Sequence, residues 1–276
     1  MVNYDFLEQN ARRIRATIAQ VLHKTNSSHI GGALSVTDIV NALYFGDVIN
    51  IDPKNPSDTQ RDKVIMSKGH CSIALYTALG AKGYFPLEKL ADYCQDGSNL
   101  KGHADLYSMP GIETTTGSLG HGLPIGTGMA LANKMDGNPG RIYVIMSDGE
   151  CQEGSVWEAA ITASRMKLDN LITIIDANGL QAFERCENMF PNDNVKKMWK
   201  DSGWALREID GHDYRQIIPA LYNLPIEKNK PSLIFANTIK GKGVSFMEDR
   251  LEWHYKSPNA EQLKQILEEL KCEPLL

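Results

Sequence analysis

A carboxylate and a carboxamide follow two apolar runs of the sequence, and both are potential ligands for a hard metal ion. Asp148 follows RIYVIMS, and Asn178 follows LITIIDA. Their side-chain oxygens suit Mg²⁺, whose octahedral shell is commonly completed by substrate phosphates and water. Gly149 removes a side chain where a phosphate would approach the backbone, and a helix beginning near Glu153 would point N–H groups towards that anion. These residues indicate a site for magnesium and an organic diphosphate.

The Asp148-Gly149 and Asn178-Gly179 pairs could also be ordinary turns, which is what either pair alone more often is. Their separation, 178 − 148 = 30 residues, fits one helix with two turns and would bring both pairs to one edge of a parallel sheet. Ligands of open parallel sheets bind at that edge. Competing motifs fail: GxxxxGK[ST] is absent, no GxGxxG follows the first strand, and the acidic spacing does not fit an EF-hand loop.

The elements that would position these residues alternate between strand and helix. Apolar runs predict strands at 63–67, 141–146, 171–176, 204–210 and 232–238. A glycine turn is predicted at Gly31-Gly32, followed by a helix of about ten residues from Val36. Helical spacing predicts further helices at 4–24, 71–80, 121–134, 153–167, 213–223 and 260–271. Residues 95–120 are predicted to form a long ordered loop. Strand, crossover helix and strand imply right-handed parallel units. We expect an α/β fold, a doubly wound, mostly parallel sheet with helices on both faces.

The composition excludes several function classes. The net charge of −5, with scattered Lys and Arg, argues against binding to nucleic acid or an anionic membrane surface. The five cysteines are widely spaced without a CxxC pair, which argues against a disulfide framework or zinc site and favours reduced thiols in the cytoplasm. Charges interrupt the N-terminus, and the longest uncharged stretch, 114–133, is rich in glycine, so neither a signal peptide nor a membrane span is predicted.

Six ordered segments resemble the transketolase family, over about residues 10 to 256. They are SSHIGGALS (27–35), SKGHCSIALY (67–76), KGH (101–103), TTTGSLGHGLPIGTGMALA (114–132), SDGECQEGSVWEA with LDNLITIIDANGLQ (147–181), and TIKGKGVSFMED with the later WH (238–254). The resemblance implies the thiamine diphosphate-binding fold of the diphosphate-binding (PP) type. Thiamine diphosphate would be the cofactor, with Mg²⁺ as the metal, or Ca²⁺ or Mn²⁺ in its place.

The resemblance also implies roles for individual residues. The metal would be bound by Asp148, Asn178 and the main-chain carbonyl of Leu180. The catalytic residues would be four histidines, which can exchange protons with sugar hydroxyls near neutral pH: His29, His70, His103 and His254. The cofactor-binding residues would be His70, Gly117, Ser118, Leu119, Gly149, Glu150, Glu153, Asn178 and His254. Glu153 could equally be an acid that stabilises a helix start, and His23 and His212 have no matched role.

Four departures from the family pattern leave the donor and acceptor sugars open. Ser147 stands where the family usually has a glycine, and His121 stands where glutamine is common. Ala182-Phe183-Glu184 replaces Ile-Asp-Gly in a loop near the substrate channel, and Ala104-Asp105 replaces Pro-Glu after a histidine.

The implied activity is transfer of a two-carbon ketol unit from a ketose, phosphorylated or similar, to an aldose, as in the pentose phosphate reactions. In the family, the cofactor lies between the PP domain and a pyrimidine domain. We expect residues 1–276 to form a single PP domain, the A subunit of a split transketolase, with the pyrimidine and C-terminal domains absent. A separate B subunit would supply the pyrimidine domain, in an α2β2 heterotetramer. Alternatives are the α subunit of a 2-oxo acid dehydrogenase, a deoxyxylulose-phosphate synthase-like subunit, or a non-catalytic subunit that retains the fold.

Overall fold

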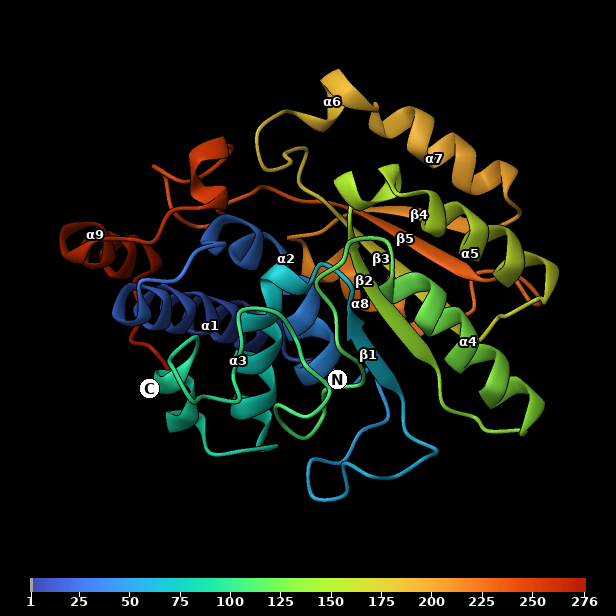
Figure 1. Ribbon diagram of the computed structural model, residues 1–276, viewed down its shortest axis with the longest axis horizontal. Helices are drawn as coiled ribbons and strands as arrows, with labels where there is room; N and C mark the ends of the chain where they lie inside the picture. Colours follow the sequence, from blue (N-terminus) through green and yellow to red (C-terminus); the bar gives the residue numbers. More distant parts are fainter. Residues whose placement is uncertain (1) are drawn as a thin grey trace.

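A five-stranded parallel sheet lies between two layers of helices in the computed structural model, which describes residues 2–276 (Figure 1). The strand order is β1-β2-β3-β5-β4, and all four neighbouring pairs are parallel. The strands are β1 (Lys63–Met66), β2 (Ile142–Ser147), β3 (Leu171–Ala177), β4 (Ala205–Asp210) and β5 (Ser232–Asn237). The carboxyl ends of the neighbouring strands β2 and β3 therefore meet at one edge of the sheet, as the spacing predicted.

Each face of the sheet has its own hydrophobic core. Along β2, Tyr143 and Ile145 pack into one core, whereas Ile142 and Val144 pack into the other, because successive side chains of a strand point to opposite faces. The first core includes α1 (Tyr4–Thr25), α2 (Ile30–Phe45), α3 (Ser72–Lys82), α8 (Tyr214–Tyr222) and α9 (Ala260–Leu270); the second includes α4 (Gly122–Met135), α5 (Gly154–Arg165) and α7 (Asn192–Asp201). The expected doubly wound α/β fold is confirmed.

The start of α2 differs from the sequence prediction. The predicted turn at Gly31-Gly32 is wrong, because α2 begins at Ile30 and runs through both glycines. A Cβ atom on Gly32 would lie 2.9 Å from Sγ of Cys71, and one on Gly31 would lie 3.0 Å from Cγ of Lys240. The two glycines therefore allow close approach of neighbouring segments, and do not end or begin a turn.

The segment after β3 contains two helices that the sequence pattern did not predict. They are α6 (Cys186–Met189) and α7, and Figure 1 shows α7 beside α5 in the layer that covers one face of the sheet. α7 is anchored by Val195 and Trp199, both buried, and the ring of Trp199 packs edge-on against Trp204 at 4.7 Å between centroids. The other predicted elements lie within a few residues of the observed ones.

The helices and the cysteines of the structure bear on the predictions made from composition. Within residues 2–276, no helix combines the length and apolar character needed to cross a membrane. All five cysteines are free thiols, and three of them, Cys71, Cys151 and Cys186, are buried.

Candidate active site

The carboxyl ends of β2 and β3 are joined by the side chain of Asp148. This residue follows β2 directly, and its Oδ2 atom accepts a hydrogen bond of 2.7 Å from the backbone N–H of Gly179, beyond the end of β3. Its Oδ1 atom accepts a second bond, of 2.9 Å, from the N–H of Gly149. Asn178 immediately follows β3, and its Oδ1 atom accepts a bond of 3.1 Å from the N–H of Leu180. The structure thus brings the three predicted metal-ligating residues to one edge of the sheet.

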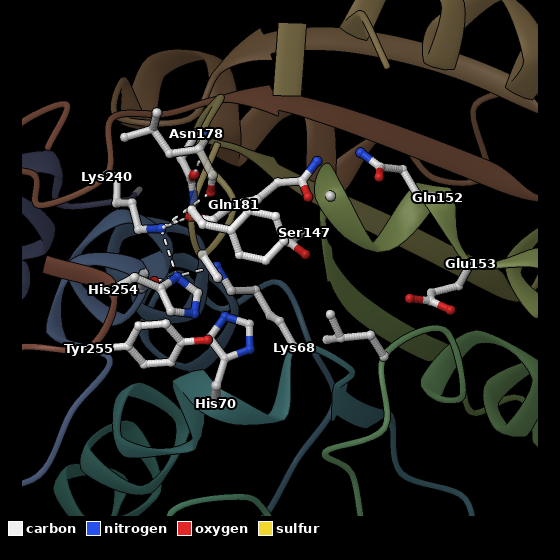
Figure 2. Close-up of a pocket in the computed structure, with 16 residues that line it drawn as sticks. Lys68, His70, Ser147, Gln152, Glu153, Asn178, Gln181, Lys240, His254 and Tyr255 are labelled. Atoms are coloured by element: carbon white, nitrogen blue, oxygen red, sulfur yellow. Dashed lines mark hydrogen bonds between the residues drawn. The ribbon is translucent and has the colours of Figure 1, made fainter. Parts of the chain in front are cut away.

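A cavity of about 330 Å³ opens at this edge (Figure 2). It is lined by residues from the ends of β2 and β3, from the loop after β5, from the first turn of α2, and from the segments that precede α3 and α4. Seven residues with predicted cofactor, metal or catalytic roles line it: His70, Leu119, Gly149, Glu153, Asn178, Leu180 and His254.

A buried ion pair that sequence reasoning missed includes Lys68, one of the residues that line the cavity. The ammonium of Lys68 donates to Oδ2 of Asp176, and both side chains are fully buried. Asp176 also accepts hydrogen bonds from Ser35 at 2.6 Å and from Thr238, and the amide of Asn178 approaches it at 3.4 Å. Burial alone would lower the pKa of Lys68, but the charge of Asp176 raises it above its ordinary value, so Lys68 carries a charge at neutral pH.

Lys240 is a second cation that the sequence analysis did not assign. Its ammonium donates to the carbonyl oxygens of Leu180 at 3.2 Å and Gln181 at 2.9 Å, and to Nδ1 of His254 at 2.9 Å (Figure 2). Burial and the nearby charge of Lys68 lower the pKa of Lys240 to about 8. Both lysines belong to motifs that carried the resemblance, SKGH and TIKGKG, so the signal was present in the sequence.

The four predicted catalytic histidines converge although they come from four distant segments. The ring centroid of His29 lies 5.4 Å from His70, 6.0 Å from His103 and 5.2 Å from His254, and His70 lies 5.4 Å from His254. The backbone supports this arrangement, because the N–H of His29 donates to the carbonyl of His254 at 3.0 Å. His29 has φ of 75°, a left-handed conformation that is uncommon outside glycine and that often marks a functional position.

Burial keeps most of this histidine cluster neutral. It lowers the pKa of His29 to about 4 and that of His254 to about 3, and nearby Lys240 contributes in both cases. It also lowers the pKa of His70 well below its ordinary value. A protonated Lys240 can only donate to Nδ1 of His254, so the neutral ring carries its proton on Nε2. Neutral imidazoles can both accept protons from hydroxyls and donate hydrogen bonds to carbonyls.

Glu150, one of the predicted cofactor-binding residues, lies outside the cavity lining. Its carboxylate is fully buried away from the cavity, where it accepts hydrogen bonds from Ser67 and from the N–H groups of Gly120 at 2.8 Å and Ser147 at 3.3 Å. With these three hydrogen bonds, the carboxylate of Glu150 stabilises the backbone at the end of β2. Ser118 is exposed and also lies outside the cavity lining.

Gly117 lies beside the histidine cluster and not in the cavity lining. It has φ of 145°, and a Cβ atom there would lie 3.3 Å from the ring of His103. Glu153 is the N-cap residue of α5 and lines the cavity, but its side chain makes no capping hydrogen bond. The position of Glu153 therefore fits both interpretations, an acid favoured by the helix dipole at a helix start and a residue that faces the cavity.

Two observations suit the cavity to a metal-bound diphosphate: the buried carboxylate of Asp148, and the surroundings of Gly149 and Gln181. Asp148 is 3% exposed and has no ion-pair partner within residues 2–276, so burial raises its pKa and a cation beside it would offset that cost. No group of three or more His, Cys, Asp or Glu side chains suited to a metal occurs in the described part of the chain, and the expected ligand set uses one carboxylate, one amide and one carbonyl. A Cβ atom on Gly149 would approach Cγ of Gln181 to 3.0 Å, and the buried Nε2 of Gln181 has no partner among these residues.

Comparison with known proteins identifies the family. The family model described as transketolase, thiamine diphosphate binding domain, matches residues 7–275. The chain belongs to the transketolase family. It is 41% identical over 264 residues to the A subunit of apulose-4-phosphate transketolase from Phocaeicola vulgatus, covering 96% of this chain and 93% of that protein. It is also 41% identical to the 6-deoxy-6-sulfo-D-fructose transketolase subunit SqwG of a Clostridium species, covering 97% of each.

Solved transketolases share the fold over almost the whole chain. The transketolase of Campylobacter jejuni superposes with a TM-score of 0.91 at 32% identity, and that of Leishmania mexicana with 0.91 at 27% identity. This chain is covered to 99% and 98%, whereas it spans only 44% and 42% of those chains. The prediction of a transketolase, with a thiamine diphosphate-binding domain, is confirmed.

Proposed function

We propose that this chain is the A subunit of a thiamine diphosphate- and Mg²⁺-dependent transketolase, which transfers a two-carbon ketol unit from a ketose to an aldose together with a separate B subunit. The observation that carries the proposal is the convergence of four histidine rings beside a cavity at the ends of β2 and β3. Four imidazole rings from four segments that meet beside one cavity favour a role in binding a ligand over four independent structural roles. In this proposal, residues 1–276 form a single PP domain.

The floor of the cavity would hold the diphosphate and its metal. Asp148, Asn178 and the carbonyl of Leu180 supply three hard oxygens for Mg²⁺, and Lys68 and Lys240 supply positive charge for the phosphates. The carbonyl of Leu180 accepts from Lys240, so metal binding requires this ammonium to share that oxygen or turn towards a phosphate. Thiamine diphosphate, when bound, supplies the electron sink that carbon–carbon bond cleavage requires.

The histidine cluster would handle the sugar. Because burial lowers the pKa of His29 and His254 to about 4 and 3, both rings are neutral at pH 7, and each carries one donor and one acceptor nitrogen. His29 and His103 would contact the donor carbonyl and nearby hydroxyls, whereas His70 and His254 would approach the diphosphate. With Nδ1 engaged by Lys240, His254 presents its Nε2–H as a donor.

The partner and the substrate class are supported by the relatives. Two relatives matched over nearly their full length are named as the A subunits of apulose-4-phosphate transketolases, from Phocaeicola vulgatus and Actinobacillus succinogenes, and a third is named for 6-deoxy-6-sulfo-D-fructose. We therefore favour a donor sugar that carries a phosphate or sulfonate group. The B subunit would supply the pyrimidine-binding half of the cofactor site, and two copies of each chain would form a heterotetramer.

The test is an assay of purified chains, alone and combined. The partner is identified as the chain that co-purifies with this one, and the pair is loaded with thiamine diphosphate and Mg²⁺. We expect ketol transfer between a phosphorylated ketose and an aldose with both chains present, negligible turnover with either alone, and loss of turnover on chelation. Turnover by the rigorously purified single chain would contradict the need for a partner. Activity on pyruvate or branched oxo acids in place of sugars would favour the 2-oxo acid dehydrogenase alternative.

A variant of the metal site tests the same proposal at residue level. Asp148→Asn removes the carboxylate but keeps its shape, and we expect it to raise the Mg²⁺ concentration needed for half-maximal activity by at least about tenfold. Asp193→Asn on α7, whose side chain is 92% exposed, is the matched control and should behave as the wild type. Equal Mg²⁺ requirements for both variants would remove Asp148 from the metal site. Failure of the wild-type pair to bind magnesium and thiamine diphosphate would favour a non-catalytic subunit.

A further inference from the structure

His212 connects a buried carboxylate to the strand end that carries Lys240, although no sequence motif assigned it a role. It lies in the turn between β4 and α8, and its side chain is only 10% exposed. Its Nδ1 atom lies 2.7 Å from Oδ2 of Asp38 on α2, and its Nε2 atom lies 2.9 Å from the backbone nitrogen of Ile239, just beyond β5. Both ring nitrogens are therefore engaged inside the protein.

The carboxylate at one end of this connection is a fixed anion. Arg15 donates to Asp38 at 2.5 and 3.2 Å, and the hydroxyl of Tyr214 donates to it at 3.1 Å. Burial alone would raise the pKa of Asp38, but the charge of Arg15 and the hydrogen bond from His212 lower it to about 2. Asp38 can therefore only accept a hydrogen bond near neutral pH.

The two partners together fix the tautomer of His212. A carboxylate only accepts, so Nδ1 carries the proton, and a backbone N–H only donates, so Nε2 must present its lone pair. The ring therefore donates through Nδ1 and accepts through Nε2, and it links Asp38 to the N–H of Ile239 by two hydrogen bonds. Arg15 on α1 contacts the Asp38 end of this connection, and Asp210 accepts the backbone N–H of His212 at 2.8 Å.

Ile239 is followed directly by Lys240, whose side chain is 2% exposed and spans the floor of the cavity to the carbonyls after β3. We propose that His212 is a positioning residue of the active site, which holds the backbone at Ile239 so that the ammonium of Lys240 faces the diphosphate end of the cavity. The assignment of that end rests on the proposed function, whereas the hydrogen bonds themselves do not.

Two conservative variants separate the two bonds of His212. Asparagine carries its amide at the level of Nδ1 and can still donate to Asp38, but it does not reach Ile239. Glutamine carries its amide at the level of Nε2 and can still accept from Ile239, but it leaves Asp38 with one donor fewer. His23→Asn is the matched control, because Nδ1 of His23 bonds the carbonyl of Pro258 at 2.8 Å, and neither residue lines the cavity.

The first measurement is hydrogen exchange of the Ile239 amide in the full chain. His212→Asn should speed this exchange about tenfold, the effect of losing one typical hydrogen bond, whereas His212→Gln and His23→Asn should leave it near the wild-type rate. The second measurement is calorimetric titration with magnesium pyrophosphate as a probe for the diphosphate end. His212→Asn should weaken pyrophosphate binding three- to tenfold, whereas His212→Gln should bind it as tightly as the wild type. We expect this affinity although His212→Gln, which leaves Asp38 with one donor fewer, should have the lower urea midpoint of the two variants.

Two results would overturn the proposal. The first is wild-type exchange at Ile239 with wild-type pyrophosphate affinity in His212→Asn, which would leave His212 only as a brace for Asp38. The second is loss of affinity in both variants in proportion to their loss of stability. If the wild-type chain failed to bind magnesium pyrophosphate, the proposed function would be in question, and exchange at Ile239 would still decide the role of His212.

Discussion

Removing the charge of Asp176 should destabilise the protein far more than removing an exposed carboxylate. The side chains of Lys68 and Asp176 are both 0% exposed, and the Lys68 ammonium also lies 3.4 Å from the carbonyl oxygen of Gly32. Asp176→Asn preserves the shape of the side chain but leaves a buried ammonium without its counter-charge. Breaking a buried ion pair in this way costs about 3–5 kcal/mol.

The size of the effect should depend on pH in a defined direction. Without Asp176, burial would lower the pKa of Lys68 below the 10.5 of the unfolded chain, the opposite of its raised value in the wild type. The unfolded variant would then bind more protons than the folded one, so its stability rises with pH. We expect the deficit relative to the wild type to shrink between about pH 7 and pH 10.

The assay is urea unfolding of the full chain followed by circular dichroism. Asp201→Asn is the control, because the Lys197–Asp201 pair has side chains that are 73% and 63% exposed, and exposed pairs contribute at most about 1 kcal/mol. The double variant Lys68→Met with Asp176→Asn should recover part of the loss, since it removes the uncompensated charge. A loss below about 1 kcal/mol for Asp176→Asn, or a deficit that grows with pH, would refute this reasoning.

Two further predictions concern packing and acid stability. Gly126→Ala should destabilise the chain by about 1–3 kcal/mol, because its Cβ would lie 2.6 Å from Val144. Gly128→Ala has open space around the added Cβ and should stabilise α4 by up to about 1 kcal/mol. The urea unfolding midpoints of the two variants test both expectations. The pKa of Asp38 is lowered from 3.8 to about 2, so it stabilises the fold by about 2 kcal/mol above pH 3.8 and loses this as the pH falls towards 2. Acid titration of Asp38→Asn should show a flatter dependence over that interval, and an unchanged slope would contradict the assignment.

The sequence by itself determined the sheet and one edge of the site. Apolar runs of alternating strand and helix length specify parallel units, because a buried strand and an amphipathic helix have different periods. The 30-residue separation of Asp148 and Asn178 then places both at neighbouring strand ends. The local glycine pattern wrongly predicted a turn at Gly31-Gly32, where glycine instead allows close packing inside α2. The sequence pattern also did not predict α7, which is anchored in the core by Trp199.

Only the tertiary structure decided how the site is held and charged. His29 and His254 are 254 − 29 = 225 residues apart, and their rings meet because the loop after β5 packs on the start of α2. The charge of Lys68, the neutral rings of the cluster and the tautomer of His212 depend on burial and on partners from distant segments. Such effects follow from distance and dielectric environment, which a local sequence pattern does not encode.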